Sequence, residues 1–591
     1  MYKRKLNIIL LLLTLLSLEA FSQSVLRNDG EINVASGFVN LQGSYQDSTS
    51  GGITLNGTIT LTGNWTNNTT GNIIESPNST GEVIFAGSTL QTIGGIGTSP
   101  FYFPKLTINT GAIVEVIAGK GVTAYGAAAF NSPLILRTTT GIRPITATFI
   151  NNSTVTGNIS SELYYYTTGS SLQATGHTLY FSSPISGATA GIFNVAARAN
   201  LMAWYNQATN AYVRITSNVA ALNPMQGYQL RSATNNTFNF TGTPNTGTIT
   251  NSGMTGIGSL DGFYLMGNPY PCVMDWSQIS MTNLYSTLWY STINASNQTV
   301  IDTWNGSVGT NNNSAGVPVD GKIPPMQSFW VCVIGGQTGS FSVGNNARTH
   351  NWGTAAFIKS AIIKDYDAFR IAVYGNSSKD EQIIMLSENG KDSMDRWDAV
   401  KLFLNQPAIA EIFTLSAEKK RLVIQSAAPV DKEKLFPLGL KVGQAGNYKF
   451  VADISGCSED HAYFLEDKQQ NITQDLGVNS EYAFKSDIVN DTDGNRFVIH
   501  IKKVLLPDIG TDNQATEANS VLIYASGQQI MIKNCPLNAQ ILVYDVLGRM
   551  VLETRSETDY KVISTNLRIG YYMVKLIDNH KITTRIVPIS L

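Results

Sequence analysis

The sequence predicts an all-β protein with an N-terminal β-solenoid-like region, then β-sandwich domains, then a small C-terminal immunoglobulin-like sandwich. Three observations predict this fold class. Short runs rich in β-branched and aromatic residues alternate apolar with polar side chains. Glycine, asparagine and aspartate turns separate these runs. Charge is also uneven, with about 22 charged residues between Ser24 and Lys359 and about 56 between Ala361 and Leu591, and such a shift marks a domain boundary.

Residues 1–22 are predicted to be a signal peptide. Lys3-Arg4-Lys5 precede an apolar run from Leu6 to Leu18, and Ala20-Phe21-Ser22 forms a small-x-small cleavage site. The apolar run is shorter than the roughly 20 residues needed to span a bilayer. We therefore expect export to the periplasm, removal of the signal, and no transmembrane segment in the mature chain.

Residues 23–160 are predicted to form the β-solenoid-like region. Runs such as Gly57–Trp65, Gly81–Gly87 and Lys105–Asn109 are too short, and too polar on one face, to bury themselves. Neighbouring runs must therefore stack on one another, as in solenoid repeats. An open β-sandwich shows the same turn spacing and stays as the alternative.

Residues 161–345 are predicted to form an aromatic-rich β-sandwich. Four of its aromatic residues are candidate platforms for glycans, because a flat ring can stack on a sugar and still expose a polar edge. These residues are Trp204, Tyr205, Trp289 and Trp304. The alternative is that they fill the core of a charge-poor sandwich, since large aromatic side chains are mostly buried.

Cys272 and Cys332 are the candidate disulfide pair. The chain has four cysteines, and their wide spacing does not fit a zinc site, whose ligands come in close pairs. Export permits disulfides, and both residues fall in the same predicted domain.

Residues 346–505 are predicted to be a second β-sandwich, and residues 506–519 a polar linker. Asp395 and Asp398 lie close together, but glycosidase carboxylates face each other across a cleft, so a solvated turn is expected here. Asp491–Asn495 resembles the start of a calcium loop. Lys502 stands where an EF-hand needs glutamate, which favours an ordinary hairpin turn.

Residues 520–591 carry three ordered motifs at the end of the chain. They are Val543–Arg549, Leu567–Lys575 and Lys581–Val587, and glycines stand at their turns. Together they resemble the type A C-terminal sorting domain of proteins exported by the type IX secretion system of Bacteroidetes. That family usually opens with Tyr-Pro-Asn-Pro, whereas Tyr524 is followed here by Ala525-Ser526-Gly527. An ordinary terminal immunoglobulin-like module is the alternative.

The resemblance implies that this domain binds the type IX secretion machinery. Its motif residues in this sequence are Tyr544, Asp545, Gly548, Arg549, Gly570, Tyr571, Tyr572 and Lys575. We therefore expect a chain that is secreted or displayed on the outer cell surface.

The composition and the absence of known catalytic motifs limit the functions that the sequence supports. A net charge of −2 and a pI near 6.3 give no electrostatic footprint for nucleic acid. No nucleophile elbow or His-Glu-x-x-His motif occurs, so no catalytic residue, metal or cofactor is predicted. We expect a non-catalytic adhesion or surface-structural protein whose partners are surface glycans or other cell-surface proteins. The alternatives are a glycan-binding protein that uses the aromatic-rich domain, and a hydrolase with an unrecognised site.

Overall fold

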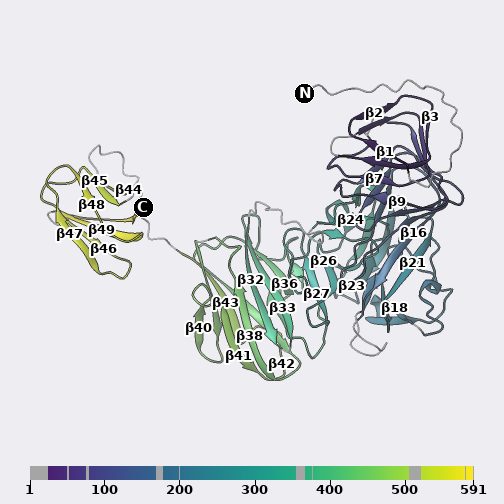
Figure 1. Ribbon diagram of the computed structural model, residues 1–591. Helices are drawn as coiled ribbons and strands as arrows, with labels where there is room; N and C mark the ends of the chain where they lie inside the picture. The colour runs from purple at the N-terminus through teal and green to yellow at the C-terminus, as the bar shows by residue number, and fades with distance from the viewer. Residues whose placement is uncertain are drawn as a thin grey trace. The chain divides into compact units, whose positions relative to one another are not determined.

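The computed structural model describes residues 24–48, 52–74, 79–167, 178–198, 200–353, 366–375, 377–458, 460–504, 521–526, 528–578 and 581–589 (Figure 1). The predicted signal peptide and the predicted linker at 506–519 lie outside these residues. Over the described ranges the protein is built from β-strands and four short 3-10 helices, which confirms the all-β prediction. The chain divides into two compact units, Met1–Lys503 and Val504–Leu591.

The N-terminal region is a β-solenoid, as predicted, because its strands pair in parallel with their neighbours one coil away. One face has the order β1-β4-β7-β9-β12-β14, and another has β14-β11-β8-β6-β3. Two smaller parallel sheets, β2-β5 and β10-β13-β15, complete it. The strands are β1 Ser24–Asn28, β2 Glu31–Val34, β3 Phe38–Leu41, β4 Gly43–Asp47, β5 Gly52–Leu55, β6 Thr58–Leu61, β7 Trp65–Asn67, β8 Glu82–Phe85, β9 Leu90–Gly94, β10 Phe101–Phe103, β11 Leu106–Ile108, β12 Ile113–Val116, β13 Gly121–Ala124, β14 Ala128–Leu136, β15 Thr148–Asn151 and β16 Val155–Tyr165.

The register explains why these polar-looking runs fold. Leu61, Phe85, Ile108 and Phe130 are partners in four successive strands, and all four side chains are buried. Each coil therefore covers the apolar face of the next, which is how a solenoid builds a core from short strands.

The middle region continues directly from the solenoid. β16 pairs in parallel with β14 and antiparallel with β21, so one strand joins the two regions and spans residue 160. The remaining elements are β17 Leu179–Phe181, η1 Ala190–Phe193, β18 Asn200–Asn206, η2 Gln207–Thr209, β19 Ala211–Ile215, β20 Tyr228–Ser232, β21 Asn236–Gly242, β22 Ile249–Thr255, β23 Gly262–Gly267, β24 Val273–Asp275, η3 Trp276–Gln278, β25 Ser280–Thr282, β26 Leu288–Ile293, β27 Thr299–Trp304, β28 Lys322–Ile323, β29 Ser328–Val333, β30 Thr338–Val343, η4 Asn345–Ala347 and β31 Arg348–Thr349.

The third region forms one large sheet with the main order β40-β39-β43-β37-β35-β36-β33-β32-β38-β41. Its pairs are antiparallel except β33 with β36, and a large apolar cluster fills its interior. The strands are β32 Tyr366–Gly375, β33 Ser378–Ser387, β34 Ala399–Val400, β35 Glu411–Leu415, β36 Arg421–Ala427, β37 Glu433–Val442, β38 Gly446–Asp453, β39 His461–Asp467, β40 Ile472–Asp475, β41 Glu481–Ser486, β42 Val489–Asp491 and β43 Phe497–Lys503.

The C-terminal unit is a small sandwich of two antiparallel sheets, β44-β45-β48 and β47-β46-β49-β50. Its own apolar cluster includes Ile530, Ile541, Val574 and Val587. The strands are β44 Leu522–Ser526, β45 Gln529–Lys533, β46 Gln540–Tyr544, β47 Met550–Arg555, β48 Tyr560–Ser564, β49 Gly570–Asp578 and β50 Lys581–Ile589.

The predicted disulfide between Cys272 and Cys332 is not formed. Both cysteines are free and fully buried, and they belong to different apolar clusters. Cys332 alternates along β29 with Val331 and Val333, which face the cluster that holds Cys272. Successive strand residues point to opposite faces, so the sheet separates the two sulfurs. The prediction that Cys272 and Cys332 belong to one domain did not indicate that their side chains lie on opposite faces of the sheet.

Among the described residues, no helix has the length and apolar character needed to cross a membrane.

Candidate functional site

A tight turn in the C-terminal unit gathers four of the motif residues. It joins β46 to β47, and the Asp545 carboxylate closes it by accepting the backbone N–H groups of Leu547 at 2.9 Å and Arg549 at 3.0 Å. The Arg549 guanidinium binds the same carboxylate, with its Nε 2.8 Å from Oδ2. These donors, the Arg549 backbone first, lower the pKa of Asp545. Gly548 has φ +75°, a conformation that favours glycine.

The four-stranded sheet beside this turn has an apolar outer face. Met550, Tyr544, Met573 and Ile586 are cross-strand partners in one row through β47, β46, β49 and β50, so their side chains share a face. Tyr571 lies two residues before Met573 on the same face, and its side chain is 65% exposed. We call these five residues the C-terminal apolar face.

The remaining motif residues support this sheet. Tyr572 points to the opposite side, is buried, and donates a hydrogen bond from its hydroxyl to the Arg568 carbonyl at 2.9 Å. Gly570 begins β49, and Lys575 is half-buried between Leu542 and Thr584 of the neighbouring strands. The motif therefore consists of a turn, an exposed face and the buried anchor behind it.

Sequence reasoning missed Met550, Met573 and Ile586 as surface residues. The signal was present in Tyr571-Tyr572-Met573-Val574, where both alternating positions are apolar. Such a strand must either be covered on both faces or expose an apolar one. Here β49 exposes one.

The four candidate glycan-stacking residues do not form a shared platform. Trp289 is fully buried, and its Nε1 donates to the Val400 carbonyl at 3.0 Å. Trp204 and Trp304 are half-buried against two different apolar clusters. The Tyr205 ring lies edge-on to Trp330, with the ring centroids 4.8 Å apart. The core-filling interpretation is therefore correct for Trp289, and the other three side chains contact separate cores.

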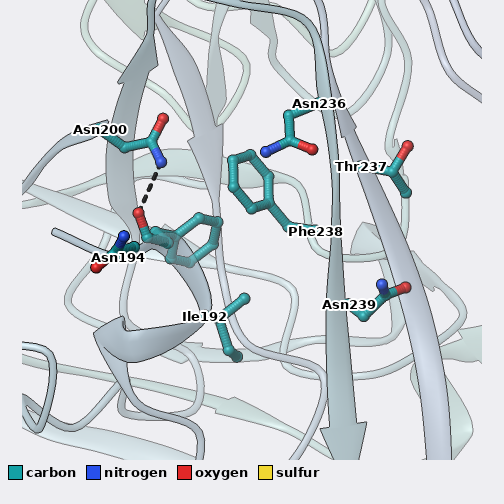
Figure 2. Close-up of a pocket in the computed structure, with 8 residues that line it drawn as sticks. Ile192, Asn194, Asn200, Asn236, Thr237, Phe238 and Asn239 are labelled. Carbon is teal, nitrogen blue, oxygen red and sulfur yellow. Dashed lines mark hydrogen bonds between the residues drawn. The ribbon is translucent and has the colours of Figure 1, made fainter. Parts of the chain in front are cut away.

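An amide-lined pocket lies elsewhere in the same region, between η1 and β21 (Figure 2). It has a volume of about 410 Å³, and its lining residues are Ile192, Phe193, Asn194, Asn200, Asn236, Thr237, Phe238 and Asn239. Asn200 is buried and donates from Nδ2 to the Phe193 carbonyl at 2.6 Å. Asn194, Asn236 and Asn239 are exposed. The sequence signal for this pocket was the run Asn235-Asn236-Thr237-Phe238-Asn239.

The paired aspartates at 395 and 398 are not a solvated turn. Asp398 is buried, and its carboxylate accepts the N–H groups of Asp395 and Ser426, both at 2.8 Å. Burial raises the pKa of Asp398 to about 7. The two backbone N–H groups take the place of water around the Asp398 carboxylate, so this side chain can cap the turn while it is buried. Neither Asp395 nor Asp398 lines the amide-lined pocket.

The calcium-like loop is closed on its own carboxylate. Asp491 accepts the backbone N–H groups of Asp493 at 3.3 Å, Asn495 at 3.1 Å and Arg496 at 3.1 Å. Gly494 supplies the bend, with φ +63°. The loop lines a pocket of about 930 Å³, but the side chain that would be the first metal ligand already caps a turn.

One group among the described residues brings three ligand-type side chains together. Asp367, Asp460 and His461 place their ligand atoms within 4.8 Å of one another. His461 Nδ1 lies 3.2 Å from Asp367 and 3.3 Å from Asp460. These contacts form a cluster of one histidine and two carboxylates.

The comparisons with known proteins match most of the first unit. A family model described as a domain of unknown function, DUF8693, matches residues 54–501. No curated protein matches the chain. A solved structure titled "Biofilm associated protein - BSP domain" matches 74% of this chain and 93% of its own, at 9% identity and a TM-score of 0.11. A likeness that low carries no argument about fold or function.

Proposed function

The chain belongs to the DUF8693 family, and we propose that it is a non-catalytic, secreted or cell-surface protein exported through the type IX secretion system. In this proposal the C-terminal unit is the sorting signal, and the β-rich body acts in adhesion or surface structure. The signal peptide at 1–22 brings the chain to the periplasm, and the C-terminal unit then directs it across the outer membrane.

The C-terminal apolar face is the observation that carries this proposal. Met550, Tyr571 and Ile586 each expose about a third or more of their side chains on one sheet, and a contiguous exposed apolar patch marks an interaction surface. The Asp545–Arg549 turn lies at the edge of this face. Two of the eight motif residues, Tyr544 and Tyr571, therefore belong to the surface that a partner would bind, and three others form the turn at its edge.

The body suits a displayed protein for a separate reason. The solenoid passes into the middle region through a shared strand, so backbone hydrogen bonds join the two regions. Strands in register over several coils also give a long, regular outer surface, which solenoids use for binding.

The first experiment compares the surface-exposed amount of full-length protein in cells that carry face variants. We expect Met573→Lys and Ile586→Lys to reduce surface material several-fold and to leave protein in the periplasm, because a charge on the face opposes apolar burial. Leu537→Lys is the matched control, since Leu537 is also apolar and exposed but lies outside this face. If all three variants were exported equally, export would not depend on the C-terminal apolar face.

Deletion of residues 521–591 tests the broader claim. We expect the shortened chain to accumulate in the periplasm. Undiminished surface material would show that export does not need this unit.

Glycan binding is the second candidate, and the amide-lined pocket favours it. Asparagine side chains donate and accept hydrogen bonds to hydroxyl groups, and four asparagines are among the residues that line the pocket (Figure 2). A glycan array probed with the full chain tests it. Binding that is lost in Asn236→Ala/Asn239→Ala and retained in Trp204→Ala would support the pocket, whereas the reverse result would support the aromatic residues.

A further inference from the structure

We propose that Lys401 and Asp380 condense into an intramolecular amide bond that covalently links two segments of the third region. Their side chains meet in the interior of the sheet, and both are close enough to the buried Glu411 for their charges to act on its carboxyl group. This inference is independent of the proposed export and adhesion roles.

The two reacting groups are already in contact. Asp380 lies on β33, and Lys401 directly follows β34. Lys401 Nζ is 2.7 Å from Asp380 Oδ1 and 2.5 Å from Oδ2. A nitrogen in contact with both oxygens lies next to the Cγ carbon that joins them. Such proximity replaces a slow bimolecular encounter with an intramolecular one.

Water is largely excluded from this contact. The Lys401 side chain is 4% exposed and the Asp380 side chain 9%. Burial disfavours the charged form of a carboxyl group, and the uncharged acid is the form that can condense with an amine.

Glu411 adds a second buried carboxyl group. It begins β35, its side chain is 4% exposed, and its Oε1 accepts the Leu404 N–H at 2.8 Å. Burial raises the pKa of Glu411, and the Asp380 charge raises it further, whereas Lys401 and Lys441 oppose the rise. Burial likewise raises the pKa of Asp380, with a smaller push from Glu381 and an opposing pull from Lys401. Buried acids around Lys401 therefore favour at least one protonated carboxyl.

The backbone supplies a donor where negative charge would develop. The Ile412 N–H donates to Asp380 Oδ2 at 2.7 Å, and Asn312 Nδ2 lies 3.4 Å from Oδ1. A fixed N–H at this distance stabilises the oxyanion of a tetrahedral intermediate.

The chemistry balances without a cofactor. The Lys401 amine attacks Cγ of protonated Asp380, and an N–C bond forms. Glu411 takes the proton that leaves the nitrogen and returns it to the Asp380 hydroxyl. The C–O bond then breaks, so that one amide and one water molecule replace the amine and the acid.

Other lysine–aspartate contacts in the chain provide the contrast. Lys322 binds Asp275, but both side chains are more than 20% exposed. Lys420 lies 2.7 Å from Asp261, and its side chain is 40% exposed. Water reaches both partners at such sites, so these pairs are expected to stay unlinked.

Mass spectrometry of the denatured, full-length mature chain tests the proposal. We expect an intact mass about 18 Da below the sequence mass, the loss of one water, and a branched peptide that joins residues 380 and 401. Recovery of Lys401 in a linear peptide with a free amine would overturn the proposal.

Variants separate a covalent link from a buried ion pair. Asp380→Ala removes the carbon that the amine would attack, and Lys401→Arg removes the amine, so each variant should show its full sequence mass. Glu411→Gln keeps both reacting groups and should also show its full mass while the circular dichroism spectrum stays that of a β-protein. A Glu411→Gln chain that is linked as fully as the wild type would overturn the role of Glu411. Lys322→Met should retain the mass deficit, and the wild-type mass alone decides the link if a variant fails to fold.

Discussion

The solenoid at 24–165 and the third region at 366–503 bury polar groups in opposite ways. In the solenoid, Asn28, Asp47 and Asn67 occupy the same register position in three neighbouring strands, and amides dominate the position. In the third region, buried acidic residues face basic ones, as Asp380 faces Lys401 and Asp467 faces Arg496. The shift in charge along the sequence is therefore also a change in how the interior satisfies its polar groups.

The strongest way to break this comparison is to remove Lys401. Lys401→Met removes both the proposed link and the basic partner of Asp380, so that a buried carboxylate is left uncompensated, which costs about 3 to 5 kcal/mol. We expect that loss in the free energy of unfolding of the first unit, measured by denaturant titration at pH 7.

The double variant Lys401→Met/Asp380→Asn provides the control. It removes the stranded charge as well, so it should recover part of the stability. If Lys401→Met were no less stable than the wild type, the contact between Lys401 and Asp380 would not stabilise the third region.

A pH titration sharpens the comparison at the solenoid surface. His350 inserts between two solenoid threonines, with Nε2 2.8 Å from Thr123 Oγ1 and Nδ1 2.6 Å from Thr148 Oγ1. Burial, and then Arg348, lower the pKa of His350 to about 3. The unfolded chain takes up this proton near pH 6.5 and the folded chain does not. Stability is therefore lost as the pH falls from about 6.5 toward 3, by roughly 1 to 2 kcal/mol between pH 7 and pH 5.

The measurement is the free energy of unfolding against pH for the wild type and His350→Gln. The glutamine chain lacks the titrating group, so its curve should fall less steeply over that interval. If the two curves were parallel, His350 would not be the group that titrates over this interval.

The sequence predicted the fold well because periodicity and turn residues are local signals. Parallel stacking was predicted from runs such as Gly57–Trp65 that could not bury themselves, and β6 and β7 form there. Contacts between segments that are distant in the sequence could not be predicted in this way. Alternation along β29 sets Cys332 against the sheet face opposite Cys272, and Trp289 packs beneath the segment at Val400. Both outcomes depend on contacts between distant segments.

The candidate site was predictable in part for the same reason. The Asp545–Arg549 turn is local, so its residues were identified from sequence. The row from Met550 to Ile586 arises only when four strands pair in one register. The contact of Lys401 with Asp380 likewise needs a particular sheet order, and no spacing in the sequence indicates it.

A smaller effect is expected from Asp47→Asn in the solenoid. Asp47 is fully buried, and this burial raises its pKa to about 6, although the Ser48 backbone opposes the rise. A raised carboxyl pKa means that stability is lost as the pH rises from about 4 through 6. Asparagine has no charge to bury, so the variant should be more stable by about 1 kcal/mol at pH 7. The gain should disappear at pH 4, and a gain that is equal at both pH values would contradict the titration of Asp47.

The smallest effect is expected from Arg137→Met, which tests whether an ion pair on the solenoid behaves like those in the third region. Arg137 binds Glu115 at 2.6 Å and Glu162 at 2.5 Å, but its side chain is 41% exposed. Water solvates much of this guanidinium, and Glu162 keeps its bond from the Thr138 N–H at 3.0 Å after the change. We therefore expect a loss of only about 0.5 to 1 kcal/mol. Salt should separate the two cases, because 1 M NaCl screens exposed charges within about 3 Å. The Arg137→Met deficit should shrink in that salt while the Lys401→Met deficit persists, and equal salt responses would mean that the two interiors treat charge alike.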